Sequence, residues 1–396
     1  MDNVPKLRFE GFTDAWERCK LGDLAIFNPK SELPDVFEYV DLESVIGTEM
    51  ISHRTETRNT APSRAQRLAQ TGDLFYQTVR PYQKNNYLFE KADKHFVFST
   101  GYAQMRPLVN GRFLLCLVQN DNFVRIVLDS CTGTSYPAIN SNDLAKIDVH
   151  SPREPQEQKQ IGDFFKNIDN LITLHQRKCK ALETAKRFYL QNMIPKKAQI
   201  SPTIRIGDFS GKWEKKKFGD IVERYEDPVP TPHGGYERLG IRSHAKGTFH
   251  SYVEEGKELE TAQMHRVAAN NFIVNITFGW EHAVAITSEN DAGKLVSHRF
   301  PQYKFNNGML PDFFRYLIID KRFKHHLSLS SPGGAGRNRV LNLGDMLLYE
   351  MLIPSADEQK EIAAFLSNLD TVIDFEQRKV KALKTTKKFL LQNMFV

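Results

Sequence analysis

Short polar loops carry the residue types in this sequence that are best suited to bonding the edges of nucleic-acid bases. The segment from Arg80 to Tyr87 mixes guanidinium, ammonium and amide groups. Arginine can form two hydrogen bonds with guanine, and asparagine or glutamine can do the same with adenine. The segment from Cys131 to Tyr136 adds hydroxyl groups of the kind that contact phosphates. Candidate DNA contacts in the first half are therefore Arg80, Tyr82, Lys84, Asn85, Thr134 and Tyr136.

The second half offers three further loops with the same chemistry. A glycine-rich segment, Ser331 to Arg339, ends in Arg-Asn-Arg, and the other two are Gly279 to His282 and Ser297 to Arg299. The alternative for each is that a basic surface loop is simply solvated, and Trp280 could belong to the core. The candidates here are Trp280, His282, His298, Arg299, Arg337, Asn338 and Arg339.

Catalytic motifs are absent from the sequence. There is no Gly-x-x-x-x-Gly-Lys-Ser/Thr phosphate loop, His-Glu-x-x-His, Gly-x-Ser-x-Gly or Gly-x-Gly-x-x-Gly. The string Asn28-Pro29-Lys30 lacks the second proline and the aromatic residue of a methyltransferase motif. The four cysteines have no Cys-x-x-Cys spacing, and only His325 and His326 cluster among the histidines. The chain is predicted to be non-catalytic, without a metal or cofactor of its own.

Composition sets wide limits on the class of protein. A chain of 396 residues exceeds the usual length of one domain, so two domains are expected. Hydrophobic residues at 40% and charged residues at 26% are ordinary for a soluble protein, and no apolar run is long enough to cross a membrane. The first residues do not resemble a secretory signal, so the cytoplasm is expected. The net charge of +6 permits a polyanionic partner without requiring one.

The elements that must position these loops occur as two similar copies in the sequence. Residues 157–193 and 358–394 are identical at 21 of 37 positions without a gap, where unrelated segments would share roughly two or three. A second echo opens each half, because Trp-Glu-x-x-Lys-x-Gly-Asp occurs at Trp16 to Asp23 and at Trp213 to Asp220. The chain therefore consists of two copies of one plan, in which an opening segment and a divergent body are followed by a long repeat.

Apolar residues in both repeats follow the spacing of one helix face, and prolines flank the segments. Each helix would be about 55 Å long. We expect the two to pack as an antiparallel coiled coil, with His175 and Glu376 near the middle of the seam. These two could form a polar pair that fixes register, or lie on a partly solvated edge. Residues expected in the helix pair or in partner binding are Ile161, Phe164, Ile168, Leu182, Phe188, Ile362, Phe365, Leu369, Leu383 and Phe389.

Each body alternates β-rich runs, turn signals and a few helical stretches, so a mixed α/β fold is predicted. Strands are expected at 73–80, 94–101, 271–278 and 283–287, and helices at 112–119 and 310–320. The expected domains are a first body at 1–152, a first long helix at 153–197, a second body at 198–354 and a second long helix at 355–396.

Two bodies, each closed by Glu-Gln-Lys-x-Ile-x-x-Phe and a helix ending in Leu-Gln-Asn-Met, resemble the specificity subunit of type I restriction-modification systems. The resemblance covers essentially the whole chain. It implies two target recognition domains that each read one half of a bipartite, asymmetric DNA site, with the helix pair as a pseudo-symmetric spacer. The divergent bodies match only short and less specific sequence motifs of the family, such as Ser99-Thr-Gly101 and Val296-Ser-His298.

The resemblance also implies partners. They would be double-stranded DNA, two copies of a modification methyltransferase subunit that methylates adenine with S-adenosylmethionine, and motor-nuclease subunits that use ATP and Mg²⁺. Three alternatives stay open: a coiled-coil scaffold that binds only proteins, a stand-alone nuclease or methyltransferase, which the missing motifs disfavour, and the specificity subunit of a related system whose single partner both methylates and cuts.

Overall fold

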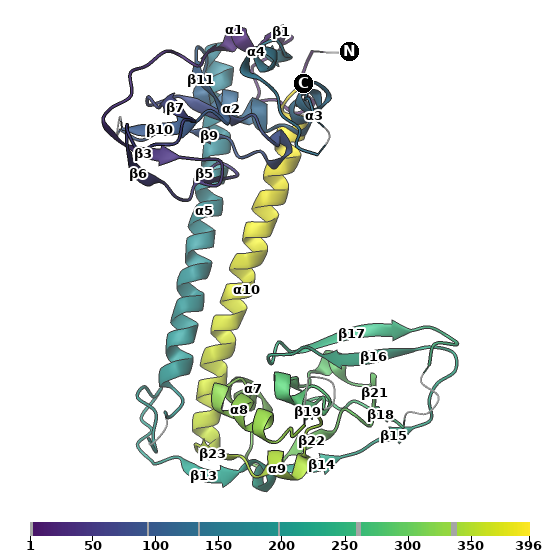
Figure 1. Cartoon of the computed structure of the whole chain (residues 1–396). Coiled ribbons are helices and arrows are strands. Elements are labelled where there is room, and N and C mark those ends of the chain that lie inside the picture. Colours follow the sequence, from purple (N-terminus) through teal and green to yellow (C-terminus); the bar gives the residue numbers. More distant parts are fainter. Residues whose placement is uncertain (1–2, 93–94, 134, 197–198, 259–262, 334–338) are drawn as a thin grey trace. The chain divides into compact units, whose positions relative to one another are not determined.

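The chain divides into two compact units, each with its own core. The computed structural model describes residues 3–92, 95–133, 135–196, 199–258, 263–333 and 339–396. The first unit comprises Met1–Lys178 and Glu376–Val396, and the second comprises Cys179–Phe375. Each unit therefore holds one globular body and a segment of each of the two long helices (Figure 1), which are α5 (Pro155–Asn192) and α10 (Ala356–Asn393). Within the described residues, no helix is long and apolar enough to span a membrane.

The body of the first unit is built on two four-stranded sheets, with strand orders β6-β3-β10-β7 and β2-β11-β8-β9. In the first of these sheets β3 and β10 run parallel, while the other neighbouring strands are antiparallel. The strands of the first body are β1 (Glu17–Lys20), β2 (Ala25–Phe27), β3 (Val36–Val40), β4 (Val45–Ile46), β5 (Glu49–Met50), β6 (Arg54–Thr57), β7 (Ala65–Leu68), β8 (Leu74–Gln77), β9 (Tyr87–Leu88), β10 (Phe96–Ser99), β11 (Tyr102–Pro107) and β12 (Asp148–Ser151).

The body of the second unit has the corresponding sheets, with orders β17-β16-β21-β18-β15 and β14-β22-β19-β20. Here β16 and β21 form the parallel pair. Its strands are β13 (Glu214–Lys217), β14 (Val222–Tyr225), β15 (Pro228–Val229), β16 (Tyr236–Ile241), β17 (Thr248–Val253), β18 (Met264–Arg266), β19 (Phe272–Val274), β20 (Val284–Ile286), β21 (Leu295–Ser297), β22 (Gln302–Phe305) and β23 (Glu350–Ile353).

The two bodies thus share one topology although their sequences diverge. Among the described residues, β15 has no counterpart in the first unit and the two-stranded β4–β5 sheet has none in the second, while the short helices occur at matching places. The predicted strands and helices are confirmed; the strands and α7 are shorter than expected, whereas α2 begins one residue earlier than expected. The short helices are α1 (Leu21–Leu24), α2 (Gly111–Gln119), α3 (Asp121–Asp129), α4 (Ser141–Ala145), α6 (Phe218–Ile221), α7 (Pro311–Leu317), α8 (Lys321–Leu329) and α9 (Leu343–Leu347).

The repeated Gly-Asp of the opening segments has a local structural cause. Asp23 accepts a hydrogen bond from the backbone N–H of Lys20 at 2.8 Å and so caps the short helix that follows. A Cβ on Gly22 would lie 3.1 Å from the carbonyl oxygen of Ala145, so glycine allows α1 to pack closely on α4. The second unit repeats this arrangement with Asp220 and Gly219.

A buried ion pair joins each opening segment to the start of a long helix. Arg8 donates two hydrogen bonds to Glu157, at 2.7 and 2.9 Å, and the Glu157 side chain is only 1% exposed. The Trp16 indole N–H donates to the same carboxylate at 3.2 Å. In the second unit Arg205 donates to Glu358 in the same way. The repeated Glu therefore fixes the helix start against its own body.

The glutamine that follows each of these glutamates completes the attachment. Gln158 accepts a hydrogen bond from the backbone N–H of Asn110 at 3.2 Å and donates to the carbonyl of Pro152 at 3.1 Å. Gln359 does the same with Leu310 and Pro354, at 2.9 and 3.1 Å. Because one buried amide satisfies backbone groups on both sides, the Glu-Gln pair of the repeat acts as a clamp.

The two long helices pack antiparallel within each unit. In the first unit, Ile161, Phe165 and Ile168 share a core with Met394 and Phe395. Asp169 and Lys387 are 2.5 Å apart across the pair. In the second unit the same two repeat positions are paired again, as Asp370 with Lys186, and the Tyr189 and Phe365 rings meet edge to face at 4.8 Å.

His175 and Glu376 form a buried polar pair. They are 8% and 2% exposed, and Nδ1 of His175 lies 2.6 Å from an Oε of Glu376. Lys178 bonds the other carboxylate oxygen at 2.5 Å. Hydrogen bonds from Lys178 and His175 lower the pKa of Glu376. Of the two alternatives that the sequence left open, the polar pair is the one present.

Substituting Glu157→Gln is expected to lower the free energy of unfolding of the first unit by about 3 kcal/mol, because it leaves the buried Arg8 charge without a counterion. Hydrogen exchange across a urea series, read on first-unit amides, measures this. Asp163→Asn, an exposed change on the same helix, is the control and should alter stability by less than about 0.5 kcal/mol. An equal effect of both variants would contradict the clamp.

Candidate nucleic-acid interface

Two of the predicted loops of the first body are joined by a stacking contact. The Arg80 guanidinium lies 4.5 Å from the centre of the Tyr136 ring, and the Arg80 backbone N–H donates to the carbonyl of Pro137 at 2.8 Å. Arg80 has a φ of +53°, and Pro81 follows it to begin a short 3-10 turn, Pro81–Gln83. The left-handed residue and the fixed proline together aim the loop outward. The sequence identified both loops but not their contact.

The remaining first-body candidates divide into surface residues and residues that serve the loop itself. Tyr82 and Tyr136 are exposed, by 49% and 64%. Asn85 accepts a hydrogen bond from the Gly47 backbone at 2.8 Å, and Lys84 forms an ion pair with Asp121. Asn85 and Lys84 therefore already have structural partners. Thr134 lies outside the described residues.

In the second body Arg339 braces a loop and stacks on Trp280. Its guanidinium donates to the carbonyls of Ser331 and Ser328 at 3.0 and 2.9 Å and lies 5.4 Å from the Trp280 ring centre. The indole N–H of Trp280 is buried without a hydrogen-bond partner among the described residues. Arg337 and Asn338 fall outside them.

The prediction for His282 as a DNA contact is wrong. His282 is only 3% exposed, and its Nε2 lies 2.7 Å from the carbonyl oxygen of Ile318. Burial lowers the pKa of His282, which keeps the ring neutral. The residue ties the loop after β19 to the turn between α7 and α8, so its polarity serves the core.

His298 and Arg299 are exposed and follow β21, beside a hollow of about 370 Å³ that no sequence motif indicated. The phenyl groups of Phe249, Phe278 and Phe300 contribute to its lining. Arg299 donates to the hydroxyl of Thr277 at 3.3 Å, on the same loop as Phe278. The hollow therefore combines apolar walls with charged groups of both signs, Arg238 and Glu281, and Arg299 lies close to it in the chain.

The ribbon formed by β16 and β17 is the part of this surface that sequence reasoning missed. A Cβ on Gly240 would lie 2.3 Å from the Phe249 ring, so glycine lets this ring lie across the partner strand. The Arg242 guanidinium lies 5.3 Å from the same ring centre. The signal was available, because two runs of six residues flank the turn at His244 to Gly247. A two-stranded ribbon is one of the elements that the DNA major groove admits.

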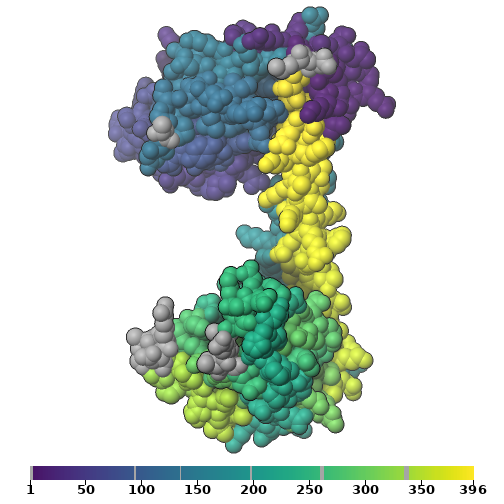
Figure 2. Space-filling view, turned by 90° about the vertical axis from the view of Figure 1, so that its right-hand side faces the viewer, coloured from purple at the N-terminus to yellow at the C-terminus, as the bar shows by residue number. Residues whose placement is uncertain are grey.

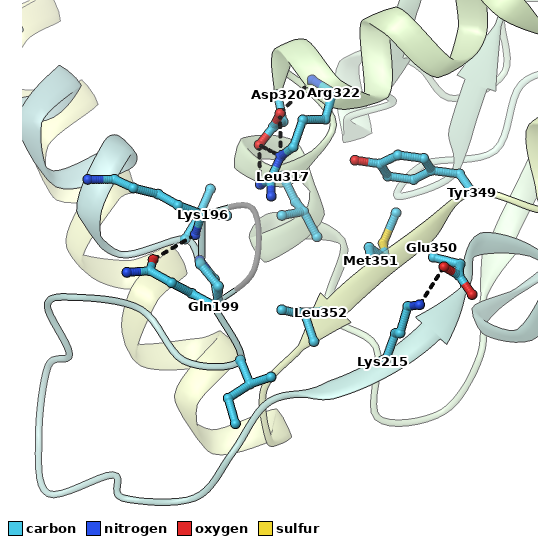
Figure 3. A pocket seen from close by; sticks show the side chains of 13 residues that line it. Lys196, Gln199, Lys215, Leu317, Asp320, Arg322, Tyr349, Glu350, Met351 and Leu352 are labelled. Carbon is cyan, nitrogen blue, oxygen red and sulfur yellow. Dashed lines mark hydrogen bonds and ion pairs between the residues drawn. The ribbon is translucent and has the colours of Figure 1, made fainter.

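A second hollow, of about 350 Å³, lies between β23 and the turn before α8 (Figure 3). Four of its charged groups pair with one another, Asp320 with Arg322 at 2.6 Å and Glu350 with Lys215 at 2.5 Å, while the Lys196 ammonium lies 3.4 Å from the Asn192 side-chain oxygen. Burial raises the pKa of Tyr349 to about 12, so its phenol stays protonated. Within the described part of the chain no group of three or more His, Cys, Asp or Glu residues could hold a metal. This hollow shows no arrangement for acid-base or metal chemistry.

The predicted helix-pair residues fall into an inner and an outer set. Ile161, Ile168 and Ile362 are buried in the seam, and Phe164, Phe365, Leu369 and Leu383 are half-buried against it. Leu182 is half-buried. Phe188 and Phe389, at equivalent repeat positions, are 52% and 56% exposed and lie outside the seam.

These two phenylalanines belong to an exposed apolar stripe that occurs on both long helices. Leu171 and Leu174 on α5 match Val372 and Phe375 on α10, and all four are exposed. An uncovered face of α10 is visible in Figure 2 (yellow). Large apolar groups gathered on a helix face indicate a surface for a protein partner.

Comparison with known proteins gives one consistent family. Residues 14–184 and 210–385 each match the type I restriction modification DNA specificity domain. The MjaVIII specificity subunit of a type I restriction enzyme from Methanocaldococcus jannaschii is 21% identical over 276 residues, and a putative MjaX specificity subunit from the same organism is 22% identical over 278. These alignments cover 65% and 64% of this chain, and 64% and 60% of the relatives.

Solved structures support the same fold. The type I restriction-modification S subunit from M. genitalium superposes with a TM-score of 0.59 at 12% identity, over 99% of both chains. A chain from a study of complex assembly and conformational transition of the type I R-M system gives 0.56 at 17% identity, over 95% of this chain and 96% of that one. At these identities the likeness concerns the fold alone.

The buried His282 generates a pH prediction. Because its folded pKa lies below the unfolded value of about 6.5, the unfolded chain binds a proton first as the pH falls. Stability should therefore decline from about pH 6.5 downward, and His282→Asn, which suits the left-handed φ of +66° at this position, should flatten that decline. Urea unfolding at pH 7.5 and 5.5 measures it, and an unchanged pH dependence in the variant would count against a neutral buried ring.

Proposed function

The chain belongs to the type I restriction-modification DNA specificity family, and we propose that it reads a bipartite, asymmetric DNA site on behalf of catalytic partner subunits. The observation that carries the proposal is the repeat, in which two bodies of one topology but unlike surface loops are each clamped to the same helix pair. Because the two bodies share one topology, each could bind DNA in an equivalent way. Because their loops differ, each would recognise a different half-site.

In the first body the proposed reading surface centres on Arg80, which contacts the Tyr136 ring, and includes the exposed Tyr82 two residues further along the loop. Stacking holds the guanidinium in one plane, which favours two-pronged bonding to a guanine edge. Lys84 and Asn85 then position this loop rather than read bases, because both are bonded within the body.

In the second body the proposed surface comprises His298, Arg299, Trp280 and the loop that ends at Arg339. Arg339 is already bonded to two carbonyls, so its expected role is to hold that loop and Trp280 in place. Arg337 and Asn338 stay candidates for base contacts on the sequence pattern alone.

The partners we propose follow from the family and from the exposed apolar stripe. Two copies of a methyltransferase subunit would each bind one end of the helix pair, since the stripe recurs at equivalent repeat positions. S-adenosylmethionine would act on those subunits, and ATP and Mg²⁺ on motor-nuclease subunits. This chain would then determine where its partners methylate adenine and cleave DNA, although it has no catalytic residues of its own.

The spacer role can be tested by inserting one heptad after Thr173 in α5 and the equivalent heptad after Asp374 in α10. Each helix would lengthen by about 10 Å, equal to about three base pairs. Genome-wide mapping of adenine methylation should show both half-sites unchanged and a longer gap between them. Altered half-site letters would refute the spacer role, and a motif that persists after deletion of the chain would refute the proposed function.

The exposed apolar stripe generates a second test. Phe188→Asp or Phe389→Asp should weaken binding of the methyltransferase subunit by about tenfold or more, because a buried aromatic contact is lost and a charge is desolvated. Gln176→Asp adds the same charge to an exposed position on the opposite side of α5 and serves as the control. Binding is measured by titration calorimetry with the subunit. Equal losses in the variant and the control would remove the stripe as a docking surface.

A further inference from the structure

Each unit has a basic hollow beside the C-terminal part of one long helix. The first basic hollow lies in the first unit and is lined by the charged residues Lys84, Asp121, Lys384, Lys387 and Lys388. The second basic hollow lies in the second unit and is lined by Arg187, Lys196, Asp320, Lys321 and Arg322. Their volumes are about 400 and 650 Å³, enough to admit a phosphodiester group with its water.

The two hollows occupy the same place in the repeated plan. Lys388, Leu391 and Gln392 line the first, and Arg187, Leu190 and Gln191, at the equivalent repeat positions, line the second. The opposite wall comes in each unit from the turn that begins α3 or α8. A feature that forms twice, on bodies whose surfaces have otherwise diverged, indicates a role common to both units.

Both hollows carry the same excess of positive charge. Each has four cationic side chains and one carboxylate. In the first hollow Asp121 pairs with Lys84 and lies 3.8 Å from the Lys388 ammonium, and Lys387 pairs with Asp169. In the second hollow Asp320 pairs with Arg322 at 2.6 Å. Lys384 and Lys388 stay exposed in the first hollow, as do Arg187 and Lys321 in the second. Gathering like charges costs stability unless an anion neutralises them.

Each hollow is connected to the proposed reading surface of its unit, through a shared loop in the first unit and through one hydrogen bond in the second. Lys84 stands in the same short loop as Arg80 and Tyr82. In the second unit, His282 joins the loop of Trp280 to the carbonyl of Ile318, directly before the residues that line the hollow. In Figure 3, Arg322 is turned toward Asp320 at the edge of the adjoining hollow, while the Lys196 ammonium points away from it. Each hollow therefore places cationic side chains in the neighbourhood of the candidate base-contacting loops.

We propose that the two basic hollows bind phosphates of the DNA backbone flanking each half-site and supply sequence-independent affinity. This inference rests on the proposed function. Lysine ammonium groups on flexible stems act as point charges, which suits backbone phosphates and carries no sequence information. The loops then select the bases, and the hollows set how strongly any duplex is held.

The test uses the full chain and two double variants, Lys384→Ala with Lys388→Ala and Arg187→Ala with Lys321→Ala. The control is Lys159→Ala with Lys360→Ala, which removes the same charge from exposed, equivalent positions near the helix starts. Fluorescence anisotropy measures Kd for a duplex with the methylated motif and for one with scrambled half-sites, over a series of KCl concentrations.

Each hollow variant should weaken binding to both duplexes by the same factor, about tenfold, and reduce the slope of log K against log salt by about 2. The control should stay within about twofold of the wild type, and replacement of Lys384 and Lys388 by arginine should retain the slope. Unchanged slopes, or a loss confined to the specific duplex, would overturn the proposal. So would unaltered DNA binding with a lost methyltransferase interaction, which would assign the hollows to an acidic protein surface.

The same measurements separate a failure of the proposed function from a failure of the phosphate-binding proposal. A wild-type chain that does not distinguish the two duplexes would refute specific reading. The salt slopes on the scrambled duplex would still report whether the hollows hold phosphates.

Discussion

The carboxylate at the start of each long helix is the constraint on which the rest of the structure depends. Glu157 and Glu358 are buried and therefore must be paired, and the arginine of the opening segment pairs each of them. The neighbouring glutamine binds backbone on both sides. A buried charge tolerates little displacement, so each body is held to its helices at one angle. The loops that we propose as DNA contacts consequently keep a fixed direction relative to the helix of their own unit.

The two bodies illustrate how one scaffold carries unlike surfaces. Sheets of the same strand order are filled by different apolar side chains, because a core demands volume and pattern rather than particular residues. Loops outside the core are freer, so Arg80 stacks on Tyr136 in one unit while Arg339 stacks on Trp280 in the other. Both surfaces therefore contain a contact between an aromatic ring and a guanidinium group, but residues at different positions in the two halves form it.

The helices, their antiparallel packing and the Glu-Gln motif could be read from the sequence because their signals are local and appear twice. The sheets could not, since the parallel pairing of β3 with β10 joins residues far apart in sequence. His282 was misassigned because sequence shows that a side chain is polar, not that the carbonyl of Ile318 meets it. For Phe188 and Phe389 the sequence leaves open whether they belong to the helix pair or to partner binding, because helical spacing alone does not separate an inner stripe from an adjacent outer one.

The pair of His175 with Glu376 has a meaning for the history of the chain. Most contacts of an antiparallel repeat are made twice, as Asp169 with Lys387 and Lys186 with Asp370 show, but at the midpoint a residue faces its own duplicate. Two identical copies would put histidine against histidine or glutamate against glutamate there, and like charges would repel. A complementary pair at that point requires two separately encoded copies. The midpoint is therefore a position where the two copies of the repeat have diverged into complementary residues.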